Sequence, residues 1–177
     1  SVTVEGNQAD YTLHNDSLVV PIGQEVKRGQ EFELSIRYSG SPRFGLLKNV
    51  NGTVWTSLLP KAQRHWVPIV DNPNVRLQTT FNISVPSGFS VWATGRKTGE
   101  EVVSVDAVTY HYSSEKEVPA SSLAFAIGRF NQDSIKNEAG QINMAIEQNL
   151  TDSVDTKEML QLANDYVNQI SDSLGQP

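Results

Sequence analysis

The sequence contains no cysteine, which excludes disulfide bonds and metal sites built from thiolates. No hydrophobic run approaches the ~20 residues with which a helix crosses a bilayer, so we expect no membrane span. Basic residues are few: 14 Lys and Arg stand against 20 Asp and Glu, and the net charge is −6. This balance disfavours nucleic acid and anionic membranes as partners, because both reward a basic surface. The 177 residues are enough for one globular domain with a small appendage.

Motifs for catalysis or metal binding are also missing. The three histidines, His14, His65 and His111, lie far apart, and none belongs to the His-Glu-x-x-His pattern of zinc enzymes. No Gly-x-Ser-x-Gly nucleophile motif or phosphate-binding loop occurs. A metal site assembled by the fold stays open as an alternative, but surface or hydrogen-bonded histidines are the simpler interpretation. We therefore predict no catalytic residue, no metal ligand and no cofactor in this chain.

Alternation of polar and apolar residues predicts β-strands over the first 130 residues. Segment 31–38 places Phe32, Leu34, Ile36 and Tyr38 on one face of a strand. Further strands are expected at Leu18–Ile22, Arg76–Val85, Phe89–Ala93, Val102–Tyr112 and Leu123–Ile127. The last of these is apolar on both faces, which predicts a covered, central strand.

Turn signals and a change of pattern near residue 130 define the fold class. Asn51-Gly52 lies between two expected strands and predicts a tight hairpin, because both residues tolerate positive φ. After residue 130 come a polar loop or hairpin, one more strand over 141–148, and helical spacing from about residue 155. The sequence predicts a mainly β fold, an antiparallel β-sandwich or saddle-shaped sheet, with one C-terminal α-helix. We expect a β-rich domain over residues 1–150 and a helical segment over 151–177.

The expected helix has recognisable ends and an apolar stripe. Ser153 or Asp155 is expected to cap its first turn, and Gly175 is expected to end it. The stripe has two possible partners, the sheet or a further domain.

One short stretch concentrates unusual side chains. Its two prolines restrict φ and exclude interior strand positions, and its indole can anchor it in the core. The residues are Arg64, His65, Trp66, Pro68, Asp71 and Pro73. A structural corner is the simpler interpretation, whereas a functional interpretation makes this stretch the rim of a cleft.

Five motifs follow one another between residues 37 and 130. They are Arg37-Tyr38-Ser39-Gly40, Val54-Trp55-Thr56, Arg64-His65-Trp66-Val67-Pro68 with Asp71-Asn72-Pro73, Val85-Pro86-Ser87-Gly88, and Leu123-Ala124-Phe125-Ala126-Ile127-Gly128-Arg129-Phe130. Each motif alone is weak. Their order and spacing together resemble the N-terminal domain of the gluzincin zinc aminopeptidases, the group of alanyl aminopeptidase and leukotriene-A hydrolase.

The resemblance implies a non-catalytic fragment that shapes one wall of a substrate cleft and docks on its own catalytic domain. Gly175-Gln176-Pro177 is similar to the point where the family's catalytic domain begins. Zinc and the His-Glu-x-x-His helix are therefore expected in that absent domain, with peptide as the substrate. The resemblance also implies that the family's first strands precede Ser1. We expect the resulting unpaired sheet edge to allow self-association.

One substrate-binding position departs from the family. There, a Gln or Glu of this domain binds the α-ammonium group of the substrate, twelve residues before the Asp of Asp-x-Pro. Counting back from Asp71 gives Leu59, in Ser57-Leu58-Leu59. Leucine accepts no hydrogen bond and carries no charge. The resemblance therefore marks Leu59, together with Ser57 and Leu58, as an altered substrate-binding position.

Two other hypotheses stay open. In one, the parent protein is a catalytically inactive relative that uses this architecture as a scaffold, and Leu59 favours it. In the other, the chain is a stand-alone β-sandwich that binds sugar or peptide, against which the ordered motifs and the terminal helix argue. Whether the parent is an enzyme depends on an intact His-Glu-x-x-His in its other domain.

Overall fold

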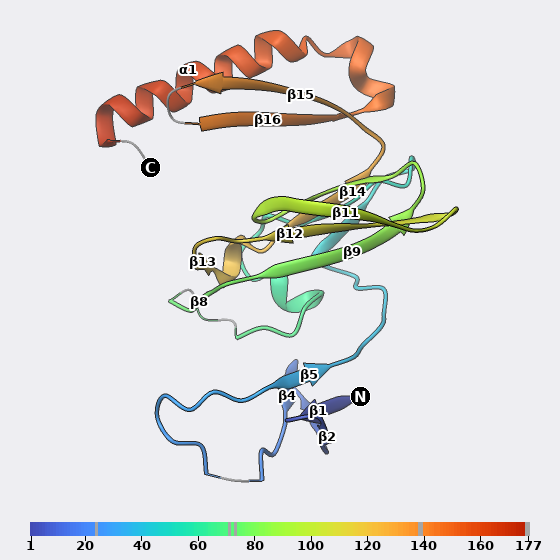
Figure 1. Cartoon of the computed structure of the whole chain (residues 1–177), viewed down its shortest axis with the longest axis vertical. Coiled ribbons are helices and arrows are strands. Elements are labelled where there is room, and N and C mark those ends of the chain that lie inside the picture. The colour runs from blue at the N-terminus through green and yellow to red at the C-terminus, as the bar shows by residue number, and fades with distance from the viewer. Residues whose placement is uncertain (24, 71, 73, 138–139, 176–177) are drawn as a thin grey trace.

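The computed structural model describes residues 1–23, 25–70, 72, 74–137 and 140–175. They form several small antiparallel sheets and one C-terminal α-helix, so the predicted mainly β fold class is confirmed. Figure 1 shows three parts along the long axis of the molecule. We call them the N-terminal unit (residues 1–38), the central body (residues 44–129) and the C-terminal unit (residues 130–175).

The N-terminal unit consists of short strands. Its elements are β1 (Val2–Val4), β2 (Asn7–Gln8), β3 (Thr12–His14), β4 (Ser17–Val19) and β5 (Leu34–Ile36). The first sheet has the order β2-β1-β5, and β3 and β4 form a separate hairpin. Two positive φ angles, 46° at Asn15 and 62° at Asp16, close that hairpin as a two-residue turn. The strands predicted at 18–22 and 31–38 are present but shorter, because β3 and β1 lie alongside them for only three residues each.

The first sheet of the central body is four-stranded. Its elements are β6 (Leu46–Lys48), β7 (Val54–Thr56), β10 (Ser90–Ala93) and β14 (Phe125–Gly128), in the order β10-β14-β7-β6. The antiparallel pair β6–β7 confirms the hairpin predicted at Asn51-Gly52, but of these two residues Gly52 alone has a positive φ, 85°, so the turn is longer than the two-residue type that Asn-Gly favours. The strand predicted at 123–127 is also confirmed, since β14 lies between β10 and β7.

The second sheet of the central body corrects one prediction. Its elements are β9 (Thr80–Pro86), β11 (Arg96–Ser104) and β12 (Ala107–Ser113), in the order β11-β12-β9, with the small pair β8 (Arg76–Leu77) and β13 (Val118–Pro119) nearby. The single strand expected over 102–112 is wrong, because the chain reverses at Val105-Asp106 and forms a hairpin. The Ser104 hydroxyl accepts a hydrogen bond from the Asp106 amide at 3.2 Å, a local turn interaction that the apolar alternation had masked.

The two sheets of the central body enclose a small core. Val85, Val91 and Tyr112 are buried there, and one of them comes from each of β9, β10 and β12. The hydroxyl of Tyr112 donates to the carbonyl of Val91 at 2.5 Å, so the one polar atom of this cluster is satisfied. Burial raises the pKa of the Tyr112 hydroxyl. Two sheets facing one core match the expected sandwich.

The C-terminal unit is a hairpin covered by a helix. Its elements are β15 (Phe130–Asn137), β16 (Gly140–Glu147), the 3₁₀ helix η3 (Gln148–Ser153) and α1 (Thr156–Leu174). Asp155 caps α1: its Oδ1 accepts from the amides of Lys157 and Glu158 at 3.1 and 3.0 Å. Gly175, with a φ of 86°, ends the helix as predicted. In Figure 1, α1 lies alongside the hairpin, on the side of β15 and β16 that is turned away from the central body.

Helix α1 presents three different faces. Leu160, Ala163 and Val167 lie on the side that meets the hairpin, and Leu160 is buried. A second apolar row, formed by Met159, Leu162, Tyr166 and Ile170, is exposed. Polar residues occupy the remaining side. None of the described helices is long and apolar enough to cross a membrane.

Candidate functional site

Residues 63–70 of the stretch with the unusual side chains, which we call the corner, lie against the first sheet of the central body, where Trp66 contacts Phe125 of β14. The corner contains the 3₁₀ helix η1 (Gln63–His65), and Gly45 packs directly against it. A Cβ at Gly45 would lie 2.5 Å from the carbonyl oxygen of Ala62 and 3.0 Å from the Cβ of His65. Gly45 also has a φ of 89°, which side chains rarely adopt. This close approach fixes the position of η1.

Aromatic side chains hold the corner. Trp66 packs edge-on against Phe125, with ring centroids 5.2 Å apart, and His65 packs edge-on against Phe44 at 4.8 Å. The carbonyl of Trp66 accepts a hydrogen bond from Tyr38 at 2.9 Å, and partial burial raises the pKa of that Tyr38 hydroxyl. These contacts anchor the corner between the N-terminal unit and the first sheet of the central body.

The other residues of the predicted motif have mixed outcomes. Pro68 is exposed and Arg64 lines the pocket described below. Asp71 and Pro73 lie outside the described residues.

Leu59, the residue at the position predicted to bind substrate, lies in a surface loop just before η1. Ser57 is buried, and its hydroxyl accepts from the Leu59 amide at 3.3 Å. Leu58 and Leu59 are 88% and 57% exposed, so neither side chain belongs to the core. The Leu59 carbonyl accepts from the Ala62 amide at 3.1 Å, which closes the loop. The loop therefore offers two apolar side chains to solvent or to a neighbouring domain.

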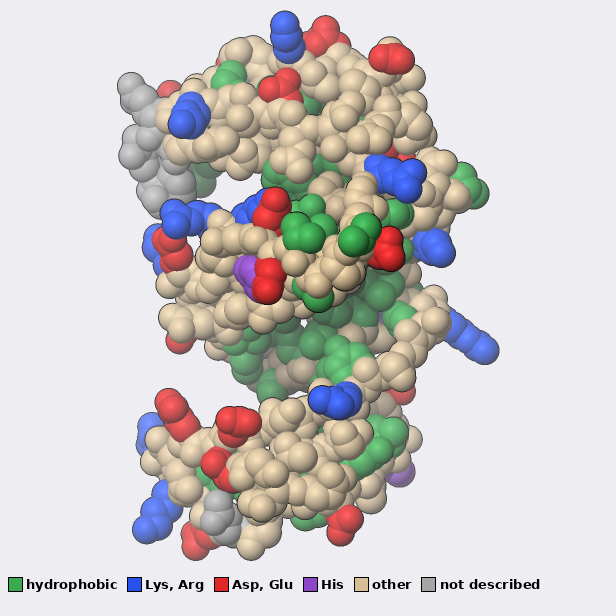
Figure 2. Space-filling view, turned by 45° about the vertical axis from the view of Figure 1, so that its right-hand side comes forward, with side chains coloured by type: hydrophobic (Ala, Val, Ile, Leu, Met, Phe, Trp, Pro, Cys, Tyr) green, Lys and Arg blue, Asp and Glu red, His purple; other side chains and the backbone are tan. Residues whose placement is uncertain are grey.

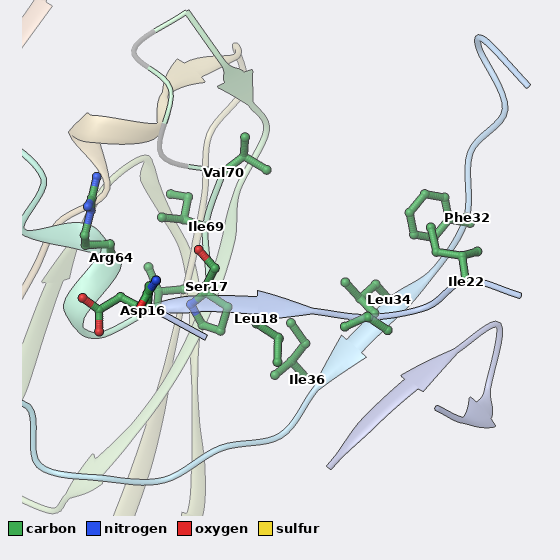
Figure 3. Close-up of a pocket in the computed structure, with 14 residues that line it drawn as sticks. Asp16, Ser17, Leu18, Ile22, Phe32, Leu34, Ile36, Arg64, Ile69 and Val70 are labelled. Carbon is green, nitrogen blue, oxygen red and sulfur yellow. The ribbon is translucent and has the colours of Figure 1, made fainter. Parts of the chain in front are cut away.

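A pocket of about 590 Å³ separates the N-terminal unit from the corner (Figure 3). Apolar side chains form most of its lining, among them Leu18, Leu34, Ile36 and Ile69. Figure 2 shows hydrophobic side chains gathered where the central body faces the N-terminal unit. Polar side chains, among them Asp16, Ser17 and Arg64, complete the lining of the pocket.

A polar junction links the C-terminal unit to the central body. Glu147, at the end of β16, accepts hydrogen bonds from the side-chain amides of Asn49 at 2.6 Å and Asn51 at 3.4 Å. Asn49 Oδ1 in turn accepts from the amides of Asn51 and Thr53, both at 3.0 Å, so one side chain organises the turn and binds the carboxylate. Hydrogen bonds from Thr53 and then Asn49 lower the pKa of Glu147. Sequence reasoning missed this junction, because its partners lie 98 and 96 residues apart and nothing in the local pattern connects them.

The histidines form no common site. His14 contacts the side chain of Asn15 at 2.9 Å, and His111 contacts Asn82 at 2.7 Å. Within the described ranges, no group of three or more His, Asp or Glu residues could hold a metal ion.

Comparison with known proteins identifies the family of this domain. The model of the Peptidase M1 N-terminal domain matches residues 1–123. The chain therefore belongs to the peptidase M1 N-terminal domain family, and the resemblance inferred from the motifs is confirmed. Among curated proteins, no match to this sequence is found.

Solved structures share the fold at low sequence identity. The M1 zinc metallopeptidase from Deinococcus radiodurans matches with a TM-score of 0.77 and 17% identity, over 99% of this chain and 42% of that chain. A mutant of the Deinococcus radiodurans enzyme bound to a Tyr-Ser-Ala substrate matches with a TM-score of 0.78 and 17% identity, over 99% of this chain and 43% of that chain. Legionella pneumophila aminopeptidase A, in complex with aspartic acid, matches with a TM-score of 0.78 and 12% identity, over 96% of this chain and 21% of that chain. This chain thus spans less than half the length of these proteins.

Proposed function

We propose that this chain is the N-terminal part of a zinc metallopeptidase of the aminopeptidase type, where it shapes one wall of the substrate cleft and docks on the catalytic domain. Its family and its coverage of under half of the similar chains support this proposal. Zinc would be held by the catalytic domain, because the described residues of this chain offer no ligand set. The whole protein would then hydrolyse peptides, with this chain contributing shape and contacts rather than chemistry.

The observation that carries the docking proposal is the exposed apolar row on α1. Met159, Leu162 and Tyr166 are 51%, 70% and 65% exposed, although they follow one helical stripe. Such a row on a surface helix marks a contact with another protein part. The proposed division places residues 1–150 in the β-rich domain and 151–177 in the helical lead into the catalytic domain. The β15–β16 hairpin links the two, because it contacts α1 and also holds Glu147.

The docking proposal is tested in the full-length parent. Leu162→Lys should expose α1, because a lysine ammonium cannot be buried in an apolar interface without a large cost. Hydrogen exchange of the α1 amides should quicken at least tenfold. Asp165→Lys is the matched control, since Asp165 lies on the polar side of the helix and is exposed. Equal exchange in both variants would reject α1 as the docking face.

The altered position suggests a second proposal, a parent without ordinary recognition of the substrate amino terminus. Leu59 is exposed and apolar where the family has a Gln or Glu, which favours a catalytically inactive scaffold or a changed specificity. A stand-alone binding module is less well supported, because it leaves the apolar row on α1 without a partner.

The full-length parent can be assayed on amino-acid arylamides to decide this point. Leu59→Glu should raise kcat/KM by roughly tenfold or more, since a charge-assisted hydrogen bond to the α-ammonium group contributes about 1.5–3 kcal/mol. Leu59→Ala should change little. Full exopeptidase activity that neither variant alters would place the amino-terminal anchor elsewhere and reject the role of Leu59.

A further inference from the structure

The segment around β5 is complementary to itself about its central residue. Reading outward from Ser35, Leu34 is matched by Ile36, Glu33 by Arg37, and Phe32 by Tyr38. If two such segments paired antiparallel, each apolar residue would therefore lie opposite an apolar residue of the other copy, and Glu33 would lie opposite Arg37. The same arrangement would arise twice, because the two halves of a symmetric pair are equivalent.

One edge of β5 is open in the described part of the chain. The amide of Arg37 donates to the Ser1 carbonyl and the Glu33 carbonyl accepts from the Glu5 amide, both at 2.9 Å, so the odd-numbered residues face β1. In an antiparallel ladder the backbone groups of alternate residues face opposite edges. The amides and carbonyls of Leu34 and Ile36 thus face away from β1, and no other described strand pairs with β5.

The side chains beside this edge are available for contact. Phe32, Leu34 and Tyr38 are 39%, 41% and 58% exposed, and Leu34 and Ile36 line the pocket shown in Figure 3. Glu33 and Arg37 are exposed, and neither forms an ion pair among the described residues. The edge therefore combines unpaired backbone groups, uncovered apolar side chains and two uncompensated charges of opposite sign.

We propose that two copies of this chain associate through β5, in an antiparallel pairing with a two-fold axis at Ser35. Leu34 and Ile36 of one copy form hydrogen-bonded pairs with Ile36 and Leu34 of the other. Glu33 and Arg37 form two ion pairs on one face, while the apolar pairs lie together on the other face. The two sheets of order β2-β1-β5 become one continuous sheet. This inference does not depend on the proposed docking of α1, which lies at the opposite end of the molecule in Figure 1.

A single-cysteine variant tests the register directly, because the chain has no cysteine of its own. In the proposed pairing the two Ser35 residues form a pair that is not hydrogen-bonded, with Cα atoms about 4.5 Å apart, which suits a disulfide. Ser35→Cys should therefore form a disulfide-linked dimer under mild oxidation. Ser39→Cys is the matched control, since its two copies would lie roughly 26 Å apart at about 3.3 Å per residue. Equal rates of cross-linking for the two variants would overturn the proposal.

Charge exchange tests the partner contacts by sedimentation equilibrium on the 177-residue chain. Glu33→Arg or Arg37→Glu alone should raise the dimer Kd about tenfold, because each change places like charges opposite one another twice. The double variant Glu33→Arg/Arg37→Glu should restore the Kd of the unaltered chain. Circular dichroism of each variant checks that the fold is kept. A chain that stays monomeric at every soluble concentration, or a double variant no better than the single ones, would overturn the pairing.

Discussion

The central body encloses Val85, Val91 and Tyr112 between two sheets, whereas Leu160 is the one buried apolar side chain among the described residues of the C-terminal unit. The body therefore holds its own core. The C-terminal unit relies instead on side-chain hydrogen bonds, such as Asn137 to Asn164 at 2.8 Å, and on the junction at Glu147. A two-stranded hairpin with one helix is marginal alone. The difference teaches that the C-terminal unit has little core of its own, which agrees with the proposal that it docks on a further domain.

The largest effect is expected at an exposed turn of the central body where the neighbouring backbone leaves no room for a side chain. Gly95 has a φ of 99°, and a Cβ there would lie 2.5 Å from the carbonyl oxygen of Ser113. Gly95→Ala should lower the free energy of unfolding by about 3 kcal/mol, because the positive φ and the clash of the new Cβ with the Ser113 backbone both strain the folded chain. Gly88→Ala is the control: its φ is 86°, but a Cβ would meet nothing within 4 Å, so about 1 kcal/mol is expected. Urea unfolding measures both, and equal losses would show that the positive φ alone matters.

A smaller and local effect is expected in the C-terminal unit. Leu160→Ala removes the buried apolar contact of α1 and should cost the unit about 2–3 kcal/mol. The helical circular dichroism signal should then vanish at a lower urea concentration than the near-ultraviolet signal of the body. In the 177-residue chain without its proposed partner domain, Leu162→Ala changes an exposed side chain and should leave both transitions unchanged. One shared transition in the Leu160 variant would contradict the independence of the two regions.

The smallest effect is a pH dependence of the junction between them. The folded structure lowers the pKa of Glu147, so this carboxylate stabilises the folded state fully at a pH above the pKa of an unfolded Glu, about 4.3. That stabilisation is lost as the pH falls through the pKa of Glu147 in the folded state. The amides of β15 and β16 should therefore lose protection from hydrogen exchange as the pH falls through the pKa of Glu147, once the rates are corrected for intrinsic exchange. Glu147→Gln should abolish this pH dependence, because an amide does not titrate. If the pH profile of amide protection were the same in the wild-type chain and in the variant, Glu147 would not stabilise the junction.

Local patterns predicted the single elements well. The Asn51-Gly52 hairpin, the central strand near residue 125 and the Gly175 helix end were all predicted from a few adjacent residues, and the structure confirms them. The errors arose where a local rule was too coarse. Alternation continued through Val105-Asp106 and concealed a turn, and strand lengths at β4 and β5 depended on neighbours that the pattern does not name.

The candidate site divides in the same way. The corner and Leu59 could be placed from motifs, and their functional roles stay predictions. The Glu147 junction and the pocket beside β5 could not be predicted, since each is assembled from segments distant in the sequence.

The sequence by itself determined the strand and helix types, the helix cap candidates, the absence of cysteine chemistry and the family. These properties follow from backbone preferences and side-chain spacing within a few residues. Only the tertiary structure decided which edge of β5 is open, which row of α1 is uncovered, and which turn receives Glu147. The reason is physical: pairing and burial depend on which distant segments meet, and that is set by the packing of the whole chain rather than by any one stretch of it.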